Sequence, residues 1–382
     1  MFLASRELVF ARGRFTLMGI VIALIAVLVV LLSGLSSGLV NDGVSGLKSM
    51  KATSFAFDKG TITDNAFSRS LVDDEQIAVW QDADGIEQAE PMGVSIVNGT
   101  TDDDEQIDLT LFGIVPGGFQ EPELSSGEQI GDRLDGIVVS ETARTEQGLE
   151  LGDVITLDRL GVELEVIGFT DGQATFGHVD VAYLPIDTWR LIASNAALPG
   201  EPTAEQVEAL DFEFASVVAV YAPDLALEDL EAIDEDADTM SMTRTEAFNA
   251  SPGYEAETLT LSMIQVFLYV ICALVVGAFF TVWTVQRKSE IAILRAVGAS
   301  RGYLLRDSLA QAAILLVGFT AIGVAIGVGL GAMMPDAMPF DLEFGPILIA
   351  SVLTIALGLI GAMLAVLRIT RVDPLNALGG QR

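Results

Sequence analysis

The stretch "RKSEIAILRAVGASRGYLLRDS" (Arg287 to Ser308) is a charged segment enclosed by two long runs that contain no Asp, Glu, Lys or Arg. These runs are Thr258 to Gln286 and Ser308 to Pro335, and two more occur at Phe15 to Val40 and Phe344 to Leu367. Each has at least 24 residues. A helix rising about 1.5 Å per residue then crosses a hydrocarbon core of about 30 Å. The sequence therefore predicts a membrane α-helical protein with four transmembrane helices.

Charge is distributed very unevenly along the 382 residues, whose formal net charge is −33. The block from Asn41 to Glu257 contains 46 acidic and 9 basic residues, whereas the rest of the chain contains 7 acidic and 11 basic residues. A connection of 217 residues is far too long for a loop and has the length of a domain. We therefore expect a large extracytoplasmic α+β domain inserted between helices 1 and 2.

The basic residues outside this block predict the orientation. All 11 lie in segments that four crossings place on one side of the membrane, and the positive-inside rule makes that side cytoplasmic. We expect a multi-pass cell-membrane protein with both termini in the cytoplasm. A cleaved signal peptide is the alternative for the first run, but its 26 uncharged residues exceed the usual apolar region of about 7–15 residues. The predicted segments are 1–14 (cytoplasmic), 15–40 (helix 1), 41–257 (outer domain), 258–286 (helix 2), 287–307 (cytoplasmic coupling segment), 308–335 (helix 3), 336–343 (external loop), 344–367 (helix 4) and 368–382 (cytoplasmic tail).

Local patterns inside the block support an α+β domain. Alternating apolar positions predict strands, and apolar spacings of three and four predict helices. The only cysteine, Cys272, lies in the second apolar run, so the outer domain contains no disulfide and depends on packing. The predicted strands are 136–140, 153–157, 162–170, 179–185 and 214–222, and the predicted helices are 140–151, 203–210 and 225–233.

Two acidic clusters invite comparison with calcium sites, because hard cations prefer several carboxylate oxygens. They are "DDDE" (Asp102 to Glu105) and "DEDAD" (Asp234 to Asp238). Neither has the Gly and the terminal Glu of a calcium-binding loop at the required offsets. The pattern favours a solvated acidic surface, and we expect no metal site.

Glycines recur at four-residue spacing in two of the apolar runs. This spacing puts them along one helix face, where small residues permit close approach of another backbone. We therefore expect helix packing, within or between chains, at these positions. They are Gly34 and Gly38 in the first run, and Gly323, Gly327 and Gly331 in the third.

The opening segment has the pattern of a short amphipathic helix. Ile291, Leu294 and Gly298 share one helical face, and Ser300 is positioned to cap the helix that follows. On this pattern alone the helix rests on lipid, serves as a solvated connector, or docks into a groove of a partner protein. The charged residues Lys288, Glu290 and Arg295 point away from the apolar face.

"RKSEIAILRAVGAS" (Arg287 to Ser300) resembles the cytoplasmic signature of the FtsX-like or MacB-type permeases of ABC transporters. "RITRVDPLNALGG" (Arg368 to Gly380) is similar to the tail of that family, and the one-plus-three arrangement of spans also matches. The resemblance implies that the segment docks onto an ATPase. The coupling residues it implies are Glu290, Ile291, Leu294, Arg295 and Gly298.

The family resemblance also implies the partners: two copies of an ABC ATPase subunit, a second copy of the permease, and the lipid membrane, with no nucleic acid. It implies mechanotransmission, in which two permease chains rock and their outer domains move as levers. Independently, none of the four lysines follows a Gly, and a phosphate-binding Walker loop requires a Gly-Lys step. We therefore expect no catalytic residues and no intrinsic cofactor in this chain, and ATP on the partner subunit.

For the substrate, the segment Val166 to Trp189 is similar to part of the haem-exporter and DevC-like branch, which makes haem a candidate. Haem iron accepts His, Met or Tyr as ligands. A packing histidine and a solvated helix start remain the alternatives for these residues. A regulator of an extracytoplasmic partner, or an exporter of peptide, antibiotic or lipid, remains the alternative function. The candidate substrate-binding residues are Tyr254, Glu255, Glu257, Met263 and His178.

Overall fold

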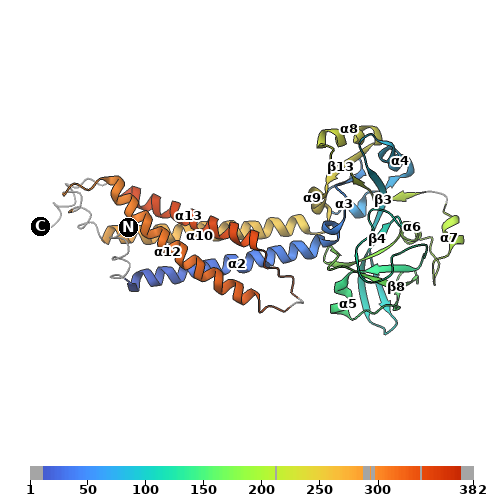
Figure 1. Ribbon diagram of the computed structural model, residues 1–382, viewed down its shortest axis with the longest axis horizontal. Coiled ribbons are helices and arrows are strands. Elements are labelled where there is room, and N and C mark those ends of the chain that lie inside the picture. Colours follow the sequence, from blue (N-terminus) through green and yellow to red (C-terminus); the bar gives the residue numbers. More distant parts are fainter. Residues whose placement is uncertain (1–11, 211–212, 287–292, 294–296, 336–337, 371–382) are drawn as a thin grey trace. The chain divides into compact units, whose positions relative to one another are not determined.

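The computed structural model describes residues 12–210, 213–286, 293, 297–335 and 338–370 (Figure 1). They form two compact units. One is helical and contains the described residues up to Gly38 and from Thr258 onward, and the other is an α+β unit from Leu39 to Glu257. Each unit is considered by itself.

Four long helices supply the helical unit: α2 (Arg12–Ser49), α10 (Tyr254–Gln286), α12 (Arg301–Gly331) and α13 (Phe344–Thr370). Each is long and apolar enough to cross a membrane. One precedes the α+β unit and three follow it, so the predicted fold class is confirmed. α2 continues to Ser49, beyond the predicted end of helix 1 at residue 40. Asp42 ends the uncharged run but keeps its backbone N–H, so it does not end a helix as Pro does.

Aromatic and aliphatic side chains fill the interior of the helical unit. Phe15 of α2 packs edge-to-face on Trp283 of α10, with ring centroids 4.7 Å apart. Cys272 and Phe280 of α10 are fully buried with Leu316 of α12. Large apolar side chains on the outer faces of the same helices are exposed. A helix that is apolar all round suits a lipid surrounding.

The glycines of the third predicted span lie against other parts of the helical unit. A Cβ on Gly323 would lie 2.4 Å from the carbonyl oxygen of Ala23, and one on Gly327 would lie 2.8 Å from Cβ of Val30. Larger side chains at these positions would push α12 away from α2. Gly34 and Gly331 lie against the ring of Phe340, and Gly38 lies against the carbonyl oxygen of Pro339.

The α+β unit is built on thirteen strands within its described residues. The order β13-β1-β12-β3-β4-β10-β6-β8-β5 forms the main sheet, with β7 and β9 paired beside this path and β11-β2 as a separate pair. The strands are β1 (Ser54–Asp58), β2 (Val72–Asp73), β3 (Gln88–Thr101), β4 (Gln106–Ile114), β5 (Leu124–Gly127), β6 (Gly136–Val139), β7 (Val154–Leu157), β8 (Glu163–Thr170), β9 (Thr175–Phe176), β10 (Val179–Pro185), β11 (Phe214–Ala215), β12 (Val217–Tyr221) and β13 (Thr239–Thr243).

Six of these strands close into a barrel, because β3 pairs with β4 and also with β7. The circuit continues from β4 through β10, β6 and β8 to β7. Closure removes free edges, which otherwise invite pairing with other chains. One core cluster includes apolar side chains of these strands, among them Leu109, Val139, Ile155 and Leu164, together with Trp189 of α6 (Ile186–Ala193).

The first half of β3 belongs to an antiparallel sheet with β12, β1 and β13. Helices α4 (Asp74–Asp82) and α8 (Leu227–Ala237) pack with this sheet and cover Val218 and Val220 of β12. Trp80 of α4 is fully buried there and donates its indole N–H to Thr239 Oγ1 at 3.0 Å. In Figure 1 these two helices lie at the opposite end of the α+β unit from α5. The helices are α3 (Ala66–Arg69), α4 (Asp74–Asp82), α5 (Glu141–Gln147), α6 (Ile186–Ala193), α7 (Ala204–Glu208), α8 (Leu227–Ala237), α9 (Arg244–Ala247) and η1 (Phe248–Ala250).

Candidate functional site

The hairpin between β9 and β10 positions the single histidine. Phe176 and Val179 pair across it, so Gly177 and His178 form a two-residue turn. Both residues have positive φ, 60° at Gly177 and 64° at His178. Two consecutive positive φ values are what a type I′ hairpin turn requires, and among non-glycine residues His is one of those that tolerates them. The turn presents the imidazole at its tip.

His178 lies between two carboxylates from distant parts of the sequence. Its Nδ1 is 2.7 Å from Asp42 Oδ2 on α2, and its Nε2 is 3.1 Å from Glu257 Oε2 on α10. The hydrogen bond to Asp42 raises the pKa of His178 above 6.5, with smaller support from the charge of Glu257 and against the effect of burial. The three residues form a charged group that we call the His178 clamp.

Further hydrogen bonds tie the same hairpin to α2. The backbone N–H of Gly177 donates to the carbonyl oxygen of Gly43 at 2.9 Å. Gln173 Nε2 donates to Asp42 Oδ1 at 3.0 Å, and the backbone N–H of Thr175 donates to Ser45 Oγ at 2.8 Å. Asp42 is therefore held by Gln173, just before β9, as well as by the imidazole. This fixes the C-terminal end of α2 on the β9–β10 hairpin.

The clamp occupies both ring nitrogens of His178. As a metal ligand the residue would first have to release Asp42 or Glu257, because each nitrogen offers a single in-plane position. The contact with Nε2 holds the carboxylate of Glu257 against the hairpin. Among the described residues, no group of three His, Cys, Asp or Glu side chains is arranged to hold a metal ion.

The structure gathers three of the five predicted substrate-binding residues. Tyr254 and His178 flank Gly43, since ring atoms of both would lie 3.7 Å from a Cβ placed there, and Glu257 completes the group. Tyr254 also packs edge-to-face on Phe248, at 6.0 Å between centroids. Glu255 is exposed on the α+β unit. Met263, 52% exposed on α10, belongs to the helical unit.

Four of the predicted coupling residues, Glu290, Ile291, Leu294 and Arg295, lie outside the described residues. The fifth, Gly298, has φ +106°, a backbone conformation that favours glycine. Ser300 Oγ accepts a hydrogen bond from the backbone N–H of Tyr303 at 3.2 Å, which confirms the predicted N-cap of α12.

The two acidic clusters have local structural roles. Asp102 to Glu105 form the turn between β3 and β4, where the N–H of Thr101 donates to the carbonyl oxygen of Glu105. Asp234 Oδ2 accepts from the backbone N–H of Ser241 at 2.8 Å, and Asp238 pairs with Lys59 at 2.7 Å.

The sequence reasoning missed Asp42. It follows the first uncharged run by two residues, and its meaning depends on His178, 136 positions further along the chain. The local signal for Asp42 was its position as a carboxylate close to the end of a predicted span. The pairing itself requires the β9–β10 hairpin to fold back onto α2.

Comparisons with known proteins cover nearly the whole chain. A family model for the MacB-like periplasmic core domain matches residues 15–235, and one for the FtsX-like permease C-terminal part matches residues 262–374. The putative hemin transport system permease protein HrtB of Staphylococcus haemolyticus is 26% identical over 378 residues, 99% of both chains. An uncharacterized ABC transporter permease of Mycobacterium tuberculosis is 21% identical over 381 residues, covering 100% of this chain and 99% of its own. The extracellular domain of the noncanonic ABC-type transporter YknZ from Gram-positive bacteria superposes with a TM-score of 0.33 at 16% identity, covering 50% of this chain and 98% of its own.

Proposed function

The chain belongs to the ABC transporter permeases that combine a MacB-like periplasmic core domain with an FtsX-like C-terminal part, and we propose that it is the permease subunit of an exporter driven by a separate ATPase. The observation that carries the proposal is the order of the two matches: the MacB-like model over residues 15–235 covers one helix and most of the inserted α+β unit, and the FtsX-like model over residues 262–374 covers the three helices that follow. The absence of a Gly-Lys step from the sequence supports a motor on another chain.

The proposed mechanism is mechanotransmission by a homodimer. Two ATPase subunits close on ATP and bind the coupling segment, through Ile291 and Leu294, more tightly in one arrangement than in the other. Such differential contact is what biases a two-state element. The His178 clamp suits this mechanism, because it fastens the outer end of α2 and the start of α10 to the same hairpin. Displacement of either helix end is then passed to the α+β unit.

Haem is the substrate that we propose. Relatives named for hemin transport align over 99% of this chain, and an acidic, aromatic group surrounds the start of α10. In this proposal Glu257 and Tyr254 meet the haem, Glu255 contributes a further contact, and His178 positions Glu257. Met263 of the helical unit stays a prediction from the sequence. Haem iron accepts Tyr among its axial ligands. The carboxylate of Glu257 would face the positively charged ferric iron rather than the propionates of the haem.

The test is a haemin titration of the full-length chain purified with the ATPase encoded beside its gene. We expect a saturable shift of the Soret band and haemin-stimulated ATP hydrolysis. Glu257→Gln should weaken both, while Glu150→Gln, at an exposed carboxylate far along the sequence, should change neither. Hydrolysis that ignores haemin, with no specific spectral shift, would remove haem as the substrate.

A second candidate function is regulation of an extracytoplasmic protein through the same ATPase coupling. The net charge of −37 on residues 41–257 favours it, because such a surface recruits basic partners. Stimulation of ATP hydrolysis by an extracellular protein, in a preparation that does not respond to haemin, would support this function.

A further inference from the structure

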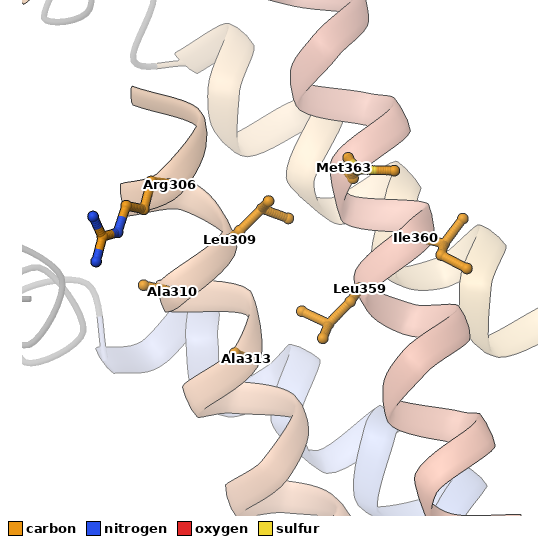
Figure 2. Close-up of a pocket in the computed structure, with 7 residues that line it drawn as sticks. All are labelled: Arg306, Leu309, Ala310, Ala313, Leu359, Ile360 and Met363. Atoms are coloured by element: carbon orange, nitrogen blue, oxygen red, sulfur yellow. The ribbon is translucent and has the colours of Figure 1, made fainter. Parts of the chain in front are cut away.

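A groove of about 400 Å³ lies between α12 and α13 in the helical unit (Figure 2). Its volume is in the range of small-molecule sites, about 300–1,000 Å³. Leu309 of α12 and Leu359 of α13 point toward each other across it. The residues that line it are Arg306, Leu309, Ala310, Ala313, Leu359, Ile360 and Met363.

The groove opens where two packed helices separate. Deeper in the unit α12 and α13 touch, since a Cβ on Gly358 would lie 2.7 Å from Leu316 Cδ2. Toward the start of α12 the small side chains of Ala310 and Ala313 leave the space empty of protein atoms. The groove is therefore a gap in an otherwise packed helix pair, with walls of aliphatic carbon.

Among the described residues that line this groove, Arg306 is the one cation, and it lies at one end. Arg306 is exposed and lies in the second turn of α12, which begins at Arg301. Figure 2 shows its guanidinium turned away from α13. Within the described part of the chain Arg306 makes no ion pair, and the adjacent Asp307 accepts a hydrogen bond from Gln311 at 3.1 Å.

An aliphatic groove that ends at an arginine near the start of a membrane helix matches the chemistry of an anionic amphiphile. Arginine stems lie along apolar surface while the guanidinium reaches the headgroup layer. Basic pockets between transmembrane helices bind anionic lipid headgroups. We propose that this groove binds one anionic phospholipid, with its phosphate at Arg306 and an acyl chain along Ala310, Ala313 and Leu359. The site does not depend on the proposed substrate.

The experiment is native mass spectrometry of the full-length chain. The chain is incubated in detergent with phosphatidylglycerol or with phosphatidylcholine of identical acyl chains, and the fraction of protein that keeps a bound lipid is measured. One cation near the membrane surface predicts about fivefold higher retention of phosphatidylglycerol. Arg306→Gln should abolish this preference and Arg306→Lys should keep it. Ala313→Phe fills the groove and should remove the bound lipid. Ala321→Phe, at an exposed alanine of the same helix, is the matched control and should retain it.

Equal retention of the two lipids by the unsubstituted chain would overturn the proposal, as would identical behaviour of Ala313→Phe and Ala321→Phe. The groove would instead be covered by a second copy if Ile360→Cys, in a Cys272→Ala background, forms a disulfide between two chains with oxidant. If Ala313→Phe fails to fold, the retention of phosphatidylglycerol relative to phosphatidylcholine by Arg306→Gln and Arg306→Lys still tests the proposal. A preference that Arg306→Gln keeps would overturn it.

Discussion

Replacing His178 with Asn should destabilise the α+β unit in a way that depends on pH. Asn tolerates the positive φ of 64° at this position, so the substitution removes the imidazole without adding backbone strain. The imidazole makes hydrogen bonds to two carboxylates, and the side chains of His178 and Glu257 are 30% and 40% exposed. Buried charge-assisted bonds contribute about 1.5–3 kcal/mol each, and solvent screening reduces this to about 1–2 kcal/mol for the whole clamp.

The pH dependence follows from the raised pKa of His178. A histidine whose pKa in the folded protein exceeds its unfolded value of 6.5 contributes its full stability below that value. The contribution is lost as the pH rises through the folded-state pKa, because a neutral imidazole keeps a donor for one carboxylate only. The difference in stability between the unsubstituted protein and His178→Asn should therefore be larger at pH 6 than at pH 9.

Thermal unfolding of the full-length chain, followed by tryptophan fluorescence, measures this effect. Trp80 and Trp189 both report on the α+β unit. For a domain of this size we expect a Tm about 4 °C lower for His178→Asn at pH 6. The control is Lys59→Gln, which breaks an exposed pair with Asp238 and should change little at either pH. A gap between the unsubstituted protein and His178→Asn that is constant or grows toward pH 9 would refute the reasoning.

Three other outcomes test the helices and the coupling segment. Gly323→Leu should lower the stability of the helical unit by about 1–3 kcal/mol, because its side chain meets the backbone of α2, whereas Gly329→Leu points into open space and should be tolerated. Trp283 of α10 reports on this unit in thermal unfolding. Glu257→Gln should weaken haemin binding about tenfold in a Soret titration, as expected for one lost charged contact. Replacing Ile291 and Leu294 together with Ala should lower substrate-stimulated ATP hydrolysis at least about fivefold while leaving the ATPase active alone, since anchor residues of an interface carry most of its energy.

Local sequence patterns predicted the parts of the fold that depend on local chemistry. Uncharged runs marked the four long helices, and alternation marked β6, β7, β8 and β10, with β10 correct to the residue at Val179–Pro185. The predicted strand 214–222 is interrupted, because Ser216 leaves β11 and β12 separate. The long strand β3 escaped notice because Pro91, Gly93 and Gly99 look like turn signals.

The missing parts depend on contacts between distant residues. Closure of the barrel through Gly99 and Leu157 requires β7 to pair with β3, although β4, β5 and β6 lie between them in the sequence. The clamp likewise needs Asp42, His178 and Glu257 from three separate regions of the chain. A periodic pattern within one segment cannot predict a contact between residues so far apart in the sequence. Propensity identifies the elements, and packing decides which of them become neighbours.

The strand order β13-β1-β12-β3 sets how early each strand can find its partners while the chain is being synthesised. The barrel strands β3 to β10 are contiguous, so that part can close as soon as Pro185 has emerged. β1 appears earlier but waits much longer, because Ser54 pairs with Val220 on one side and Thr243 on the other. Such long-range pairing is slow and leaves a strand exposed to aggregation in the meantime. We therefore expect the nascent chain to depend on a chaperone or on the membrane surface until residue 243 has been synthesised.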